Sequence, residues 1–105
     1  MTTTLDFIEY VCDQISDVGV VRHKKMFGEY MVYVNDKPIL LVCDNTVYVK
    51  ILPCLDRLLS DADKGHPYNG AKEHYILDME DRELAKQVVL ALEPVTPIPK
   101  SRKKK

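Results

Sequence analysis

The sequence predicts an α+β fold in which a single, largely antiparallel sheet of about five strands carries helices on one face. Three observations support this class. Apolar residues recur at helical spacing near both ends of the chain, segments of strand length in between alternate or run apolar, and short turns rich in Asn, Asp and Pro separate those segments. The predicted order of elements is therefore α-β-β-β-β-α-β-α.

The first predicted element is a helix that begins near residue 3 and ends near residue 16. Thr3 followed by Asp6 resembles a capping box, with Asp in the place of the usual Glu, and Gly19 ends the helical pattern. We expect one apolar stripe to pack on the sheet, made of Leu5, Ile8, Val11, Cys12 and Ile15.

Four strands are predicted to follow as a meander. The first is basic in its middle, the second and fourth alternate between apolar and other residues, and the third is apolar at every position, which is typical of a strand covered on both faces. Turn residues that tolerate left-handed backbone separate the later strands, at 35–38 and 44–45. The expected strands are residues 20–26, 29–34, 39–43 and 46–51.

The second half of the chain predicts a short helix, a long loop, a fifth strand and a last helix. Pro53 suits the first turn of the short helix, and Asp81 suits the cap of the last one. The loop, residues 60–72, is polar, and the fifth strand is 74–79. The apolar positions are Leu55, Leu58 and Leu59 in the short helix and Leu84, Val88, Ala91 and Leu92 in the last. We expect one domain over residues 1–94 and a flexible, Pro- and Lys-rich basic tail over 95–105.

One face of this sheet is expected to lack a helical cover. The predicted strand 39–43 is apolar on both sides, and Met31, Tyr33 and Tyr48 add to the face that the helices leave open. A sheet face this apolar favours a partner, so the sequence predicts a homodimer through it.

Composition excludes several classes of protein. The longest apolar run, residues 39–43, is far shorter than the ~18–20 residues that span a membrane. The N-terminus lacks the basic and apolar segments of a secretory signal, so we expect a cytoplasmic protein without membrane contact. Three cysteines without Cys-x-x-Cys spacing, and three histidines without ligand spacing, predict reduced thiols and neither metal nor cofactor.

The charge of the chain is divided between an acidic body and a basic end. Positions 1–99 hold ten basic and sixteen acidic residues, which suits a phosphate backbone poorly. The tail indicates at most weak, salt-sensitive nucleic-acid contact, or a solvated end that keeps the chain soluble. Its cations are Lys100, Arg102, Lys103, Lys104 and Lys105.

Catalytic signatures are scarce. No phosphate-binding or dinucleotide fingerprint occurs, and the one conceivable nucleophile pair, Cys54 with His66 or His74, competes with a buried place for Cys54 in its leucine-rich helix. The segment GHPYNGAKEHY, residues 65–75, is either a ligand-facing loop using His66, Tyr68 and His74 or a polar connection with Tyr68 tucked under the last helix.

The stretch RHKKMFGEYMVYVNDKPILLVCDNTVYVK, residues 22–50, resembles the N-terminal domain of the TfoX/Sxy competence regulators. In that family a basic strand runs into Met-Phe-Gly-Gly-Tyr-Gly, followed by a hairpin, an aliphatic strand and a Leu-Tyr-Leu-Lys-like strand. Pro67 and Tyr68 in the long loop also fit the family. The matching residues of the motif are Met26, Phe27, Gly28 and Tyr30; Glu29 and Met31 stand where the family has glycine.

The resemblance implies a fold similar to type III secretion chaperones and a regulatory role, since full-length members are transcriptional coactivators of competence genes that work with the cyclic-AMP receptor protein. Their helical C-terminal domain is not matched here, so we expect a stand-alone module. The leading hypothesis is a non-enzymatic regulatory or protein-interaction module, with transcription machinery among its partners, acting through the sheet face or the corner at 26–30. The alternatives are a small-molecule-binding or enzymatic protein using the 65–75 loop, and a weak DNA-binding accessory using the tail.

The corner itself has a structural interpretation. Gly28 is expected between the first two strands, where a residue without Cβ permits unusual φ or a close approach. Met26 and Phe27 are then expected to pack under the first helix, and the alternative is that they form a surface contact.

Overall fold

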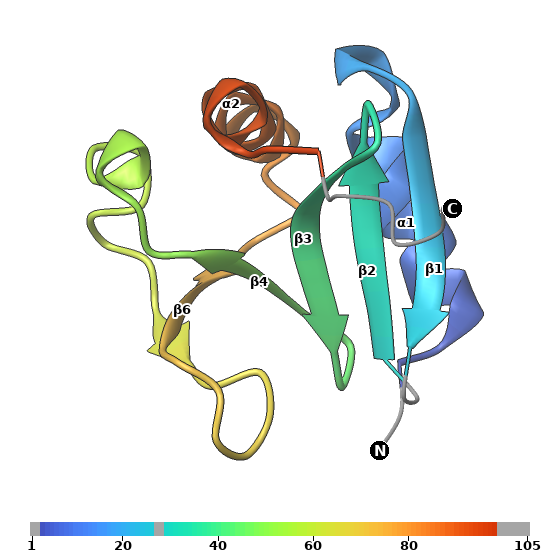
Figure 1. Cartoon of the computed structure of the whole chain (residues 1–105), viewed down its shortest axis with the longest axis horizontal. Coiled ribbons are helices and arrows are strands. Elements are labelled where there is room, and N and C mark those ends of the chain that lie inside the picture. Colours follow the sequence, from blue (N-terminus) through green and yellow to red (C-terminus); the bar gives the residue numbers. More distant parts are fainter. Residues whose placement is uncertain (1–2, 27–28, 99–105) are drawn as a thin grey trace, which may run out of the picture.

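The computed structural model describes residues 3–26 and 29–98, and in these residues two α-helices accompany one antiparallel sheet of six strands (Figure 1). The predicted α+β class is confirmed. The sheet has the order β1-β2-β3-β4-β6-β5, so its first four strands form the expected meander. The strands are β1 (Val21–Met26), β2 (Glu29–Val34), β3 (Lys37–Cys43), β4 (Thr46–Lys50), β5 (Lys64–Gly65) and β6 (His74–Leu77).

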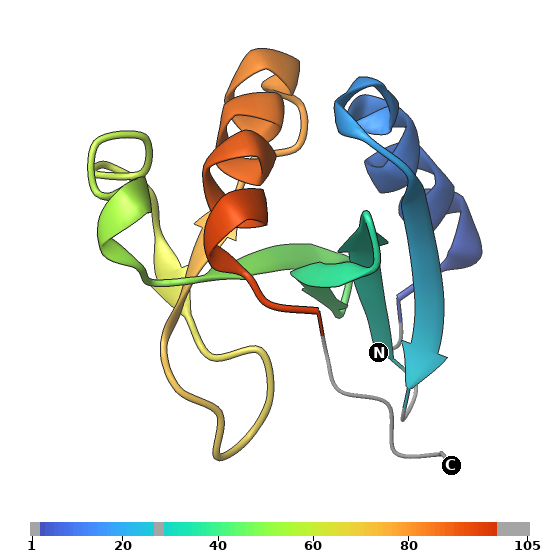
Figure 2. The same ribbon diagram turned by 45° about the horizontal axis from the view of Figure 1, so that its top comes forward.

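The helices pack on one face of the sheet, as expected. In Figure 1, α1 lies behind β1 and β2, and Figure 2 shows α1 and α2 side by side over the same side of the sheet. The short helix expected at Pro53 is a 3₁₀ turn. The elements are α1 (Leu5–Gln14), α2 (Arg82–Leu92) and the 3₁₀ turns η1 (Ser16–Val18), η2 (Pro53–Leu55) and η3 (Glu93–Val95).

The helix caps were predicted correctly at one helix and wrongly at the other. Asp81 caps α2 as expected, because the backbone N–H of Leu84 donates to its Oδ1 at 3.1 Å. At α1 the cap is Thr4, whose Oγ1 accepts from the N–H of Phe7 at 3.3 Å. A capping box on Thr3 is therefore wrong, since the Thr3 hydroxyl is used in a tertiary contact described below.

Two tight turns set the register of the meander. Asn35–Asp36 and Asp44–Asn45 each place two consecutive residues at positive φ, between 53° and 67°. Two-residue turns of this kind match the twist of antiparallel strands, and Asn and Asp tolerate the left-handed backbone that they require. The first turn is shorter than the predicted 35–38, because β3 begins at Lys37 and Pro38 already pairs with Tyr33.

The hydrophobic core lies between the sheet and the two helices. Alternate residues of each long strand point into it, so that β2 contributes Tyr30, Val32 and Val34. Among the largest fully buried side chains are Ile8, Val11, Ile15, Leu40, Val42, Val47, Val49, Leu55, Leu59 and Val88. An ion pair from Lys86 Nζ to Asp17 Oδ2 at 2.9 Å joins α2 to η1 and lowers the pKa of Asp17.

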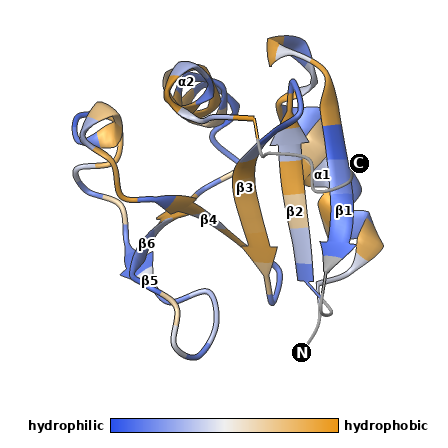
Figure 3. Ribbon diagram, in the orientation of Figure 1, coloured by the Kyte–Doolittle hydropathy of each residue, from blue (hydrophilic) through white to orange (hydrophobic). Residues whose placement is uncertain are grey.

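The strand β3 is covered less completely than its sequence predicted. Leu40 and Val42 face the core, but Leu41 points to the opposite side and is only half-buried. The register shifts between Val32 and Tyr33, which leaves Ile39 as an extra, bulged residue in β3. Figure 3 shows β3 as the most continuously apolar strand and β1 as a largely polar one.

Candidate functional site

A row of half-buried side chains crosses the sheet on the face opposite the helices. Cross-strand pairs join Met31 to Leu41, Leu41 to Tyr48 and Tyr48 to Ile76, so the four side chains lie next to one another on β2, β3, β4 and β6. Each stays partly accessible because neither α-helix covers this side. We call this side of the sheet the open face.

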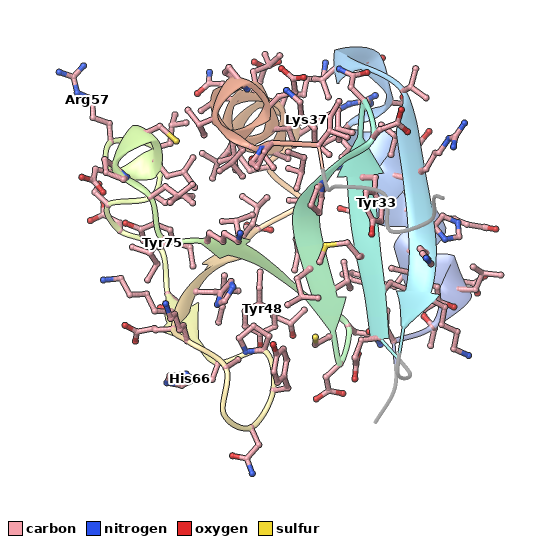
Figure 4. All side chains as sticks on the ribbon, in the orientation of Figure 1. Tyr33, Lys37, Tyr48, Arg57, His66 and Tyr75 are labelled. Atoms are coloured by element: carbon pink, nitrogen blue, oxygen red, sulfur yellow. The ribbon has the colours of Figure 1, made fainter. Side chains whose placement is uncertain are left out.

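The loop between β5 and β6, residues 66–73, folds against one end of the open face. Together they enclose a hollow of about 330 Å³, to which the sheet contributes Met31, Ile39, Leu41 and Tyr48 and the loop contributes Tyr68 and Ala71. Figure 4 shows Tyr48 on the side of β4 that faces this loop. Two features that the sequence singled out separately, the apolar sheet face and the long loop, therefore form one site.

Hydrogen bonds inside the loop fix its shape. His66 Nδ1 donates to the Ala71 carbonyl at 2.9 Å, and His74 Nδ1 donates to the Lys72 carbonyl at 2.7 Å, since a carbonyl can only accept. The Ala71 N–H donates to the Tyr68 carbonyl at 3.0 Å. Of the three residues expected to face a ligand, Tyr68 and His74 line the hollow, whereas His66 lies outside it and supports the loop.

The rim of the hollow is cationic. Lys50 on β4 and Lys72 on the loop both line it, next to His74, whose ring meets that of Tyr48 edge-on at 6.5 Å. No carboxylate lines the hollow within residues 3–26 and 29–98. In a chain whose positions 1–99 are acidic overall, this hollow combines apolar walls with local positive charge.

The corner at 26–30 is partly described. Met26 ends β1, and Phe27 and Gly28 lie outside the described residues, so the expectations for them, including an unusual φ at Gly28, stay predictions. Tyr30 is buried in the core with 9% of its surface exposed, and its ring meets His23 edge-on at 5.8 Å. Tyr30 therefore acts in packing and does not offer a surface contact.

Sequence reasoning missed the part played by Glu29, one of the two residues that replace a family glycine. Its Oε1 accepts from the Thr3 hydroxyl at 3.3 Å and from the backbone N–H of Asp44 at 3.2 Å. The Thr3 hydroxyl also accepts from the N–H of Asn45 at 3.2 Å. This network joins the start of the chain to the β3–β4 turn, and the signal that pointed to it was the departure from glycine.

The proposed catalytic pairing of Cys54 is not formed. Cys54 is exposed on η2, so the buried place considered for it is also wrong, and among the described residues its thiol has no hydrogen bond to either histidine. No group of three or more His, Cys, Asp or Glu side chains in residues 3–26 and 29–98 is arranged to hold a metal ion. No helix in these residues is both long and apolar enough to cross a bilayer.

The cysteines should differ strongly in reactivity. Burial, with the nearby carboxylates of Glu29 and Asp44, raises the pKa of Cys43 to about 11, whereas Cys54 is exposed. At about pH 8 we expect iodoacetamide to alkylate Cys54 first and to leave Cys43 unmodified until the protein unfolds, as followed by peptide mass spectrometry. Equal labelling of both thiols in the folded protein would contradict this assignment.

The raised pKa of Cys43 also makes the free energy of unfolding fall as the pH rises from about 9 toward 11, because the thiol ionises at a lower pH in the unfolded chain than in the folded protein.

Comparison with known proteins places the chain in a family. The family model for the TfoX N-terminal domain matches residues 13–92, which include all six strands and reach the end of α2. The chain belongs to the TfoX N-terminal domain family. The match confirms the resemblance seen in residues 22–50 and suggests a competence-regulator-like module.

A relative of the chain is found in Spirochaeta aurantia. It is described as an uncharacterized 12.7 kDa protein in the trpE 5′ region, and it is 32% identical over 107 residues that cover 100% of this chain and 93% of the relative. No solved structure matches the chain, so the similarity to type III secretion chaperones stays a prediction.

Proposed function

We propose that this TfoX N-terminal family member is a non-enzymatic, cytoplasmic regulatory module that binds a protein partner through the hollow on its open face. The observation that carries the proposal is the row of Met31, Leu41 and Tyr48, which neither α1 nor α2 covers and which the 66–73 loop turns into a hollow. Transcription machinery is the partner class that the family membership suggests.

The chemistry of the hollow indicates the kind of segment it takes. Its apolar walls suit one aliphatic or aromatic side chain, and burial of such an anchor supplies most of the affinity in typical interfaces. Lys50 and Lys72 at the rim attract negative charge and reject positive charge. We therefore propose an acidic partner segment with one apolar anchor. A homodimer through the open face, as expected from the sequence, is the competing occupant.

Site-specific photo-crosslinking tests this proposal. Benzoylphenylalanine in place of Tyr68 substitutes one aromatic for another at a side chain that is 60% exposed beside the hollow, and the matched control is Leu90, 57% exposed on α2. Irradiation of living cells should give a discrete heavier adduct from position 68 and none from position 90. An adduct of twice the chain mass would assign the face to a second copy, and equal adducts from both positions would contradict the proposal.

The positive charge at the rim of the hollow should control the yield of the photo-crosslinked adduct from position 68. Reversing it with Lys50→Glu and Lys72→Glu should reduce the position-68 adduct about tenfold or more, because two attractive charges become repulsive. The control Lys25→Glu changes an exposed lysine on the helix side of β1, where it pairs with Tyr30, and should leave the yield unchanged. An adduct that persists after both rim changes would exclude an acidic partner.

A small anionic molecule is the second candidate ligand. At about 330 Å³ the hollow reaches the lower end of the range for small-molecule sites, and two of the predicted loop residues line it. A carboxylate or phosphate metabolite that raises the melting temperature of the wild type, and not of the Lys50→Glu/Lys72→Glu variant, would support this function. Nucleic-acid contact through Lys100 and its neighbours rests on the sequence alone, because they lie outside the described residues.

A further inference from the structure

A larger cleft lies on the other side of the sheet, among the helices. It encloses about 750 Å³ and is lined by four parts of the chain that are distant in sequence: α1, the β3–β4 turn, the segment 57–63 after η2, and the connection from β6 into α2. This volume falls within the range of sites that bind ligands or partner side chains. No residue lines both this cleft and the hollow, although Ile76, which pairs with Tyr48 in the row on the open face, borders the cleft.

Part of the cleft wall is apolar and partly accessible. Phe7 from α1, Leu58 from the segment after η2 and Leu84 from α2 all pack against the core but remain half-exposed. The ring of Tyr10, 6.1 Å from that of Phe7, continues the wall toward solvent and is 37% exposed. Three separate elements thus present apolar surface to one concave site.

The rim of the cleft is acidic. Four exposed carboxylates line it, from Asp61, Asp63, Asp78 and Glu80, against one cation, Arg57. Figure 4 shows Arg57 extending away from the body of the molecule. None of the four carboxylates forms an ion pair within residues 3–26 and 29–98, whereas other acidic side chains do, at Asp17, Asp36 and Glu93.

We propose that this cleft binds a basic, amphipathic segment of a protein partner. Apolar side chains of the segment would pack on Phe7, Leu58 and Leu84, and its Lys or Arg residues would lie against the carboxylates, as in helix-in-groove recognition. The acidic rim repels nucleic acid and acidic peptides, so it selects a partner opposite in charge to that of the open face. Beyond the proposed function, the module would then have two docking surfaces, one for an acidic and one for a basic partner segment.

The chain's own tail is the competing occupant. It supplies five cations, but residues 99–105 contain no apolar side chain other than Pro99 to fill the cleft. If the tail occupied the cleft, replacing those cations with serine would raise the affinity for an added basic peptide severalfold, and that result would overturn the proposal.

Three synthetic peptides of about four helical turns test the cleft with the full chain. One is an amphipathic helix with Leu at positions i, i+3, i+4 and i+7 and Lys on the opposite face, one replaces Lys with Glu, and one replaces Leu with Ser. In fluorescence anisotropy only the Leu/Lys peptide should bind. In NMR spectra the backbone amide shifts that it changes should be those of residues 57–63 and 78–80, and not those of the loop at 66–73. Equal binding of the Leu/Glu or the Ser/Lys peptide, or shift changes confined to the open face, would overturn the proposal.

A charge-matched pair of variants completes the test. Asp61→Asn with Asp63→Asn removes two rim charges without large steric change and should weaken the Leu/Lys peptide about tenfold. The control, Glu9→Gln with Asp36→Asn, removes two exposed carboxylates outside the cleft and should change the affinity less than twofold. Thermal melts of both variants should show a cooperative transition close to that of the wild type, which establishes that they fold. An equal loss of affinity in the test and control variants would show that the peptide responds to net charge alone, and would overturn the proposal.

Discussion

Replacing Leu40 with alanine should lower the free energy of unfolding by about 2–5 kcal/mol. Leu40 is fully buried on β3, pairs with Val32 and is among the largest buried side chains of the core. Strands on both sides of β3 limit how far the surroundings can close the cavity that alanine leaves. Urea denaturation followed by circular dichroism measures the loss as a lower midpoint with an unchanged slope.

Leu41→Ala is the matched control, since it changes the same side chain one residue along the same strand. Leu41 points to the open face and is half-buried, so its truncation should cost about 1 kcal/mol or less. It should instead weaken capture of a partner at the hollow. A one-residue slip in register would exchange the two faces of β3, so equal or reversed losses would contradict the assignment.

Local patterns sufficed for much of the fold. The alternation of Tyr30, Val32 and Val34 places them on the core face, and Asn and Asp pairs mark both tight turns, because each of these features depends on neighbours in sequence. The two-residue strand β5 is too short to carry a periodicity, and so it was missed. The bulge at Ile39 was also missed, since it depends on how β2 and β3 align.

The candidate sites were less predictable because they depend on contacts distant in sequence. The sequence identified the apolar open face and the 65–75 loop, but only the pairing of β4 with β6 shows that Tyr48 and Tyr68 line one hollow. The acidic cleft was not foreseen at all. Its carboxylates, at 61–63 and 78–80, look in the sequence like ordinary solvated loop residues until the fold brings them together with Phe7.

Gly19→Ala should cost about 1–3 kcal/mol of folding free energy, from strain and from a steric contact. Gly19 has a φ of 155°, which side chains of L-residues rarely adopt, and an added Cβ would lie 2.8 Å from Asn35 Oδ1. That oxygen accepts from the N–H of Val20 at 3.0 Å, so moving it aside breaks the bond. A thermal melt of the variant should show a melting temperature lower than that of the wild type by roughly 4–8 °C for each kcal/mol lost.

Two further variants separate the two causes of the Gly19→Ala cost, the steric contact with Asn35 and the strain of the backbone conformation. Gly70→Ala also imposes a positive φ, of 89°, but its Cβ would meet nothing within 4 Å, so it should cost only about 1 kcal/mol. In an Asn35→Gly background, which removes the obstructing side chain and its bond to Val20, Gly19→Ala should cost less than in the wild type. An identical cost in both backgrounds would show that Asn35 exerts no steric constraint on Gly19. The loss would then come from the backbone conformation alone.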